Sequence, residues 1–242
     1  MKRHFITLVL TGILILAAVG PALAANSNPG VIPNKGHKYG ELGAQWWQWA
    51  SSFPYADIPY FNPGGPVDIS AHQSGNVWFL AGAAFGLGPV TRTGVVPAGT
   101  QLFFPLGNVI NDYPCPEPPP FQPDPGETME HFLQRTGNDF LDDYLGIPHP
   151  PTSVLPDLFA TIDGAPLSDL SAYRATSSLF MFTADPALAS YDSCITGTPQ
   201  PGVAVGYWLL VTPLTPGTHT LHFGAPAMFQ DITYILTVKP GH

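Results

Sequence analysis

Short apolar and aromatic runs, each closed by glycine or proline, recur along most of this chain and limit its fold more than any other feature. Proline alone makes up 29 of the 242 residues. The dipeptide Asp163-Gly164, which stands between two alternating runs, suits a type I′ hairpin turn. Strands at this density predict a mainly β fold, a β-sandwich or a jelly roll. The expected strands lie within residues 76–82, 100–110, 158–167, 177–184, 203–211, 219–224 and 232–238.

The segment at residues 39–53, which contains the sequence QWWQW, is expected to form a short helix that ends before a proline. Its large apolar residues recur at helical spacing and share one face: Leu42, Trp46, Trp49 and Phe53. We therefore expect Trp46 and Trp49 to be buried. Trp47 points about 100° away from Trp46. It is either a second packing contact or an exposed ring that is available for binding.

A second helix is expected at residues 128–145. Apolar residues recur there at helical spacing, Thr128 can cap the first turn, and Gly146 ends the pattern. Gly137 lies in the middle, where it could split the helix in two.

The segment at residues 109–127 is rich in proline, which cannot donate a backbone hydrogen bond to a sheet. We expect an extended surface loop held at Cys115. The alternative is a lid or a partner-docking segment, because long loops without regular structure are often functional.

The amino terminus has the pattern of a secretory signal peptide. Lys2 and Arg3 precede an apolar run, and Ala22-Leu23-Ala24 has the small residues that signal peptidase needs. The alternative of a membrane anchor fits less well, because the run falls short of the ~20 residues that span a bilayer. We therefore expect residues 1–24 to be removed and residues 25–242 to be exported to the periplasm or the extracellular space without a membrane span. Those residues are expected to form a single β-sandwich domain, with a subdivision near residue 150 as the alternative.

The expected mature chain is acidic. Residues 25–242 contain six lysines and arginines against seventeen aspartates and glutamates, a formal charge of −11. This balance argues against nucleic acid as a partner. Disorder is also excluded, because 45 % of the chain is hydrophobic and its fifteen phenylalanines are enough to build a core.

The chain has two cysteines, Cys115 and Cys194. In an exported protein the expected state of such a pair is a disulfide, and the alternative is a free or metal-bound pair.

The run LTPGTHTLHFGAPAMFQDITYILTV, from Leu214 to Val238, resembles the last hairpin of bacterial immunoglobulin-like modules. More loosely, the order of WWQWASSFP, VWFLAG, VPAGTQLFFPLGN, TIDGAPL and PGTHTLHF resembles a group of exported bacterial β-sandwich proteins of unassigned function. The resemblance implies an immunoglobulin-like part at residues 151–240 and no particular chemistry.

No sequence motif of an established catalytic class occurs, neither a nucleophile elbow nor a phosphate-binding loop nor a zinc-binding helix. His219 and His222 would point to opposite faces of a strand, a poor arrangement for one metal ion. The acidic clusters at residues 111–112 and 138–143 offer oxygen ligands for calcium but match no known calcium loop. We therefore expect no metal and no cofactor, with calcium as the alternative.

Two classes of function remain. The favoured one is a non-catalytic envelope or extracellular protein that binds a protein or glycan partner through loops and exposed aromatics. Its candidate binding residues are Trp47, Asp112, Tyr113 and Arg174. For Arg174, one of few basic residues, we also expect a structural ion pair.

The alternative is a secreted enzyme that acts on polysaccharide. It would use paired carboxylates as acid and base, drawn from Asp57, Asp68 and Asp112.

Overall fold

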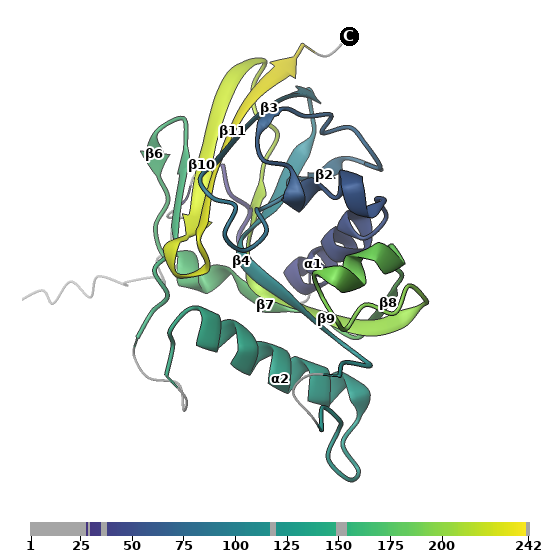
Figure 1. Ribbon diagram of the computed structural model, residues 1–242. Coiled ribbons are helices and arrows are strands. Elements are labelled where there is room, and N and C mark those ends of the chain that lie inside the picture. Colours follow the sequence, from purple (N-terminus) through teal and green to yellow (C-terminus); the bar gives the residue numbers. More distant parts are fainter. Residues whose placement is uncertain (1–27, 29, 35–37, 117–119, 149–153, 241–242) are drawn as a thin grey trace, which may run out of the picture.

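The computed structural model of the protein describes residues 28, 30–34, 38–116, 120–148 and 154–240, so the expected signal peptide lies outside the described residues. Two β-sheets and two α-helices make up the described fold (Figure 1). The predicted mainly β sandwich with two helices is confirmed. None of the helices in the described ranges is long and apolar enough to cross a membrane.

Two long connections, residues 113–128 and 145–158, flank the second helix. The helices are α1 (Lys38–Ala50) and α2 (Met129–Tyr144), with 3-10 turns at Tyr55–Asp57, Pro59–Phe61, Leu170–Tyr173, Pro186–Ser190 and Pro226–Met228. The strands are β1 (Gly65–Pro66), β2 (Val77–Phe79), β3 (Val90–Pro97), β4 (Gln101–Asp112), β5 (Phe159–Ile162), β6 (Ala165–Pro166), β7 (Arg174–Thr176), β8 (Phe180–Phe182), β9 (Gln200–Val211), β10 (Gly217–Ala225) and β11 (Gln230–Lys239).

Each sheet combines strands from both halves of the chain. One sheet has the order β1-β3-β11-β10-β5-β6, and the other has the order β2-β4-β9-β7 with β8 also paired to β9. β3 runs parallel to β11 and to β1, and β2 runs parallel to β4, while the remaining pairs are antiparallel. The hairpin expected near the carboxyl end is present as β10 and β11. The turn at Asp163-Gly164 has positive φ at both residues, as a type I′ turn requires.

Strand β3 is absent from the strands predicted by sequence. Its pattern is hidden because Arg92 occupies an inward position where alternation calls for an apolar residue. Arg92 is 1 % exposed, and its guanidinium donates to the carbonyls of Ala81 and Gly82 and to the hydroxyl of Tyr234. A buried arginine therefore ties β3 to the segment that follows β2.

The prediction of one strand at 177–184 was wrong in part. Within that range only Phe180–Phe182 (β8) forms a strand, and residues 177–179 separate it from β7, which ends at Thr176. The Ser177 hydroxyl accepts a hydrogen bond from the backbone N–H of Ala204 at 2.9 Å, in place of a backbone carbonyl. This side-chain bond interrupts the regular pairing with β9.

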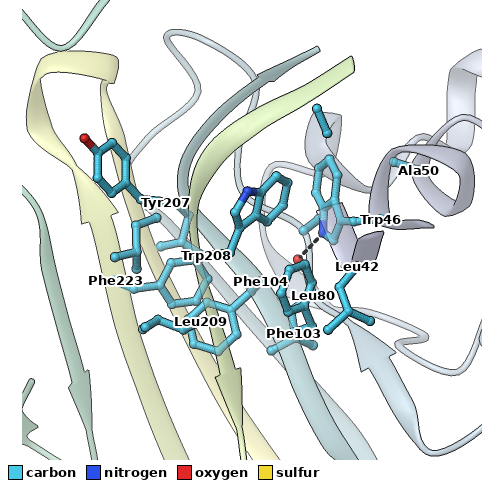
Figure 2. Close-up of a cluster of buried hydrophobic side chains, with 14 of the residues drawn as sticks. Leu42, Trp46, Ala50, Leu80, Phe103, Phe104, Tyr207, Trp208, Leu209 and Phe223 are labelled. Atoms are coloured by element: carbon cyan, nitrogen blue, oxygen red, sulfur yellow. Dashed lines mark hydrogen bonds between the residues drawn. The ribbon is translucent and has the colours of Figure 1, made fainter. Parts of the chain in front are cut away.

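The long pair β4–β9 forms the centre of the fold and carries side chains on two faces. Its register runs from Leu102 opposite Val211 to Asp112 opposite Gly202, with a bulge between Pro105 and Gly107. A bulge accommodates a proline within a strand. Figure 2 shows the residues on the two sides of this pair: Phe104, Leu209 and Phe223 on one side, and Phe103, Trp208, Trp46 and Leu42 on the other.

Helix α1 packs on β9 as its apolar stripe predicts. Trp46 and Trp49 are buried, and Trp46 Nε1 donates to the carbonyl of Leu80 at 2.9 Å (Figure 2). Trp49 Nε1 donates to the carbonyl of Ala71 at 3.1 Å.

Helix α2 is continuous through Gly137, so the helix is not split there, which was the alternative to the single helix predicted. A Cβ at Gly137 would lie 2.9 Å from the Cβ of Asn111 and 3.1 Å from a methyl of Val205. Glycine at this position therefore lets α2 approach β4 and β9 closely. Thr128 caps the helix by accepting a hydrogen bond from the backbone N–H of His131.

The proline-rich loop begins later than predicted, because residues 109–112 belong to β4 and pair with β9. Within residues 109–127 the first proline is Pro114, so residues 109–112 contain no proline that would prevent strand pairing. The disulfide between Cys115 and Cys194 pins the loop to the segment before β9, as expected. Farther along, the ring of Phe121 packs on Phe132 of α2 with centroids 4.7 Å apart.

Candidate functional site

A cleft of about 720 Å³ lies beside the second half of β4. This volume is within the range of small-molecule sites, ~300–1,000 Å³. β4 pairs with β9 on one side, while β2 covers its other side only at residues 101–103. The cleft occupies the space beyond β2, between α1 and α2. The segments at 82–85 and 188–195 complete its walls.

The indole of Trp47 forms part of the cleft wall. Burial of Trp46 and Trp49 fixes the orientation of α1, which turns Trp47 toward β4. The half-buried Trp47 ring meets Trp46 edge-on with centroids 5.0 Å apart and meets Tyr60 at 6.1 Å. Its Nε1 atom is buried, yet it has no acceptor among the described residues.

Asn108, on β4, also lines the cleft and carries a second such donor. Its Nδ2 atom is buried and also has no partner in the described part of the chain. The residue opposite on β9 is Gly206, where a Cβ would lie 2.7 Å from the Cβ of Asn108. Glycine there leaves room for the amide. An unsatisfied buried donor costs ~1–3 kcal/mol. Two donors on one cleft therefore favour a ligand that supplies acceptor oxygens.

Asp112 closes the far end of the cleft, where β4 ends. It is only 3 % exposed, and it accepts a hydrogen bond from Nε2 of Gln200, which also donates to the carbonyl of Cys194 at 3.0 Å. Burial and the neighbouring charge of Asp192 raise the pKa of Asp112 to about 7, although the bond from Gln200 opposes this rise. The disulfide beside this network holds Asp112 and Asp192 on one end of the cleft.

Helix α2 forms the opposite wall and is docked by polar contacts. The amide of Asn111 donates to the carbonyl of Leu133 at 2.9 Å and to the hydroxyl of Thr136 at 2.7 Å. This docking turns Asp139 and Asp143 toward the cleft.

Exposed aromatic rings surround the mouth of the cleft. The most exposed are Phe85, at 53 %, and Tyr191, at 50 %, with Phe140 and Tyr144 on α2. Phe85 contacts Tyr144 with centroids 5.9 Å apart. The ring of Phe229, next to Phe85 at 5.0 Å, extends this surface. Phe229 has a φ of 55°, a conformation that costs energy in a bulky residue.

The structure brings together only part of the predicted site. Trp47 and Asp112 both line the cleft. Tyr113 is half-buried beyond β4, where its backbone N–H donates to the carbonyl of Pro201 at 3.0 Å. Arg174 forms an ion pair with Asp142 and donates to the hydroxyl of Tyr207 at 3.2 Å, which agrees with the structural role expected for it.

The three carboxylates proposed for polysaccharide hydrolysis do not share one cavity. Asp57 and Asp68 line a separate cavity of about 270 Å³, whereas Asp112 lines the large cleft. This division follows from the fold, because residues 57 and 68 lie near β1 and β3, at the edge of the other sheet.

The residues expected as calcium ligands have other contacts. Asn111 docks α2, and Asp142 pairs with Arg174. Within the described ranges, no three side chains of histidine, cysteine, aspartate or glutamate gather into a metal-binding group. His219 has local partners: its Nε2 donates to the carbonyl of Thr215 at 2.8 Å, and its Nδ1 lies 2.7 Å from the Asp163 carboxylate.

Sequence reasoning missed Asn108, Asp192 and the aromatic rim. A signal for Asn108 existed, because a polar residue interrupts the apolar run FFPLGNVI of a buried strand. For Asp192 and the rim the sequence holds no local signal, since they meet the cleft only through the fold.

Comparison of the chain with protein-family models, with curated proteins and with solved structures finds no match in any of the three.

Proposed function

We propose that this protein is exported and binds a glycan in the cleft between α1 and α2, without catalysing a reaction. The observation that carries the proposal is the pair of buried donors, Trp47 Nε1 and Asn108 Nδ2, on a cleft with aromatic walls. Sugar hydroxyls supply acceptor oxygens to such donors, and the same hydroxyls donate to carboxylates. The apolar face of a sugar ring suits an aromatic wall.

The disulfide supports the exported location, because stable disulfides are typical of oxidising compartments outside the cytoplasm. The predicted signal peptide at residues 1–24 points the same way.

A glycan array with the purified protein tests the proposal. We expect binding to at least one class of oligosaccharide and its loss in Trp47→Phe, which removes the indole donor. The matched control is Trp78→Phe, because Trp78 lies on β2 and lines a different groove. Absence of binding to every glycan, or equal binding by wild type and Trp47→Phe, would contradict the proposal.

A second candidate is hydrolysis of the bound polysaccharide. It is favoured by one observation: Asp112, with a pKa raised to about 7, lies near Asp192. A protonated carboxyl beside an ionised one is the pair that glycoside hydrolysis uses. Binding remains the better supported function, because Asp112 is almost fully buried and its carboxylate already accepts a hydrogen bond from Gln200. Release of reducing ends that is lost in both Asp112→Asn and Asp192→Asn would establish hydrolysis.

A further inference from the structure

Three aromatic residues on the rim of the cleft each stand next in sequence to an aspartate that also lines it. The pairs are Asp139-Phe140 and Asp143-Tyr144 on α2, and Tyr191-Asp192 before β9. The two pairs on α2 are four residues apart and so lie one above the other. The rings of Phe140 and Tyr144 are in contact, with centroids 4.7 Å apart. The rim therefore repeats an aromatic ring beside a carboxyl group.

The charge of the cleft wall has one sign. Asp139, Asp143 and Asp192 line it, and no lysine, arginine or histidine does so in the described part of the chain. Asp112 also lines it, but its pKa of about 7 leaves the carboxyl mostly uncharged at about pH 6. Arg135, one turn before Asp139, offsets part of this charge. Its guanidinium is shared, however, since it bonds Glu127 at 2.9 Å and also attracts Asp124 and Asp139. Among the described residues, the charges on the wall are therefore mainly negative.

We infer that the glycan bound in the cleft is a cationic amino-sugar oligosaccharide, one whose rings carry free amino groups. An ammonium group is attracted both by aromatic ring faces and by carboxylates. An ammonium group is a donor only, so it cannot accept from the N–H groups of Trp47 and Asn108. The hydroxyl oxygens of the same sugars supply those acceptors. Acidic glycans would be repelled by the wall. This inference rests on the proposed glycan binding.

Titration calorimetry with three oligosaccharides of equal length tests the inference: a glucosamine oligomer, its N-acetylated counterpart and an oligogalacturonate. At about pH 6 exposed carboxyls are ionised. At low salt we expect the glucosamine oligomer to bind about tenfold more tightly than the acetylated one. The difference should shrink at high salt, because the added charge interaction is screened. The oligogalacturonate should bind most weakly.

The double variant Asp143→Asn/Asp192→Asn identifies the source of the preference. It should reduce the tenfold ratio to about two or less, because the hydroxyl contacts are common to both oligomers and only the glucosamine oligomer loses a charge interaction. The matched control is Asp57→Asn, which neutralises an exposed aspartate outside the cleft and should keep the full ratio.

The outcomes separate this inference from the proposed function. If no oligosaccharide binds to the wild type, the proposed glycan binding is itself wrong. If the glucosamine oligomer and its N-acetylated counterpart bind equally tightly, only the amino-sugar inference is overturned. It is also overturned if an oligolysine of the same charge binds as tightly as the glucosamine oligomer and displaces it, because the site would then recognise a basic peptide.

Discussion

The rings of Trp46 and Trp47 meet almost at right angles with centroids 5.0 Å apart, but among the described residues only the first of the two indoles has a hydrogen-bond partner. Trp46 donates to the carbonyl of Leu80 and fastens α1 to the chain after β2. Trp47 lines the cleft and keeps a buried N–H without an acceptor among the described residues. We therefore assign the two adjacent tryptophans different roles, one in stability and, under the proposed function, one in binding.

Replacement of each tryptophan by phenylalanine should separate these roles. Trp46→Phe leaves the Leu80 carbonyl without its donor and creates a cavity, so we expect a loss of about 2–4 kcal/mol in the free energy of unfolding. Trp47→Phe removes a donor that has no acceptor in the described part of the chain, so its stability should stay within about 1 kcal/mol of wild type. Urea unfolding measures both values. A larger loss in Trp47→Phe than in Trp46→Phe would contradict these roles.

The disulfide should contribute strongly to stability, because it closes a loop with a sequence separation of 79. In the chain-entropy model a loop of this length is worth roughly 4–5 kcal/mol. We expect Cys115→Ser/Cys194→Ser to lose about 2–5 kcal/mol, measured by thermal unfolding with and without reductant. The wild type should lose the same amount on reduction, and the variant should not respond to reductant. A variant as stable as the oxidised wild type would show that the bridge has no stabilising role.

The raised pKa of Asp112 makes a prediction about pH. Between the unfolded pKa of 3.8 and the folded pKa of about 7, the native state binds more protons than the unfolded state. Stability should therefore fall as pH rises through this window, by at most about 4 kcal/mol from this group. Asp112→Asn keeps an oxygen for Gln200 but cannot ionise.

The difference in unfolding free energy between Asp112→Asn and wild type isolates this group from others that titrate, such as His219. We expect the difference to be near zero at about pH 4 and to grow in favour of the variant until about pH 7. A difference that stays constant with pH would show that Asp112 titrates normally in the folded protein.

Gly137→Ala should destabilise the protein, although alanine normally favours a helix by about 1 kcal/mol over glycine. The new Cβ would meet Asn111 at 2.9 Å and push α2 away from β4. We expect a net loss of about 1–2 kcal/mol in thermal unfolding. In a double-mutant cycle, Val205→Ala should relieve part of this loss, because Val205 is the other close neighbour. An increase in melting temperature would mean that α2 does not pack this closely.

Much of the local structure could be predicted from the sequence. The stripe of Trp46 and Trp49, the cap at Thr128 and the turn at Asp163-Gly164 depend on residues close together in the chain. Strand β3 could not be predicted, because its inward Arg92 is stabilised by hydrogen bonds to the carbonyls of Ala81 and Gly82, which lie in another segment. Its parallel pairing with β11 joins residues about 140 apart, for which the sequence holds no local signal.

The candidate site was predictable only in fragments for the same reason. The position of Trp47 on the predicted helix made it a candidate, and so did the position of Asp112 just before the proline-rich segment. Their meeting in one cleft depends on β4 lying open beyond β2 and on α2 docking through Gly137. Neither condition is visible in a sequence pattern.

The indole N–H resonance of Trp47 offers the most direct measurement of glycan binding in the cleft. In a ¹⁵N–¹H spectrum the five tryptophans give five indole signals, and Trp47→Phe identifies the one that belongs to Trp47. On titration with a glucosamine oligomer, the account predicts a large shift of the Trp47 signal and little change in the signal of Trp46, whose N–H already bonds Leu80. A bound oligomer that leaves the Trp47 signal in place would contradict the account.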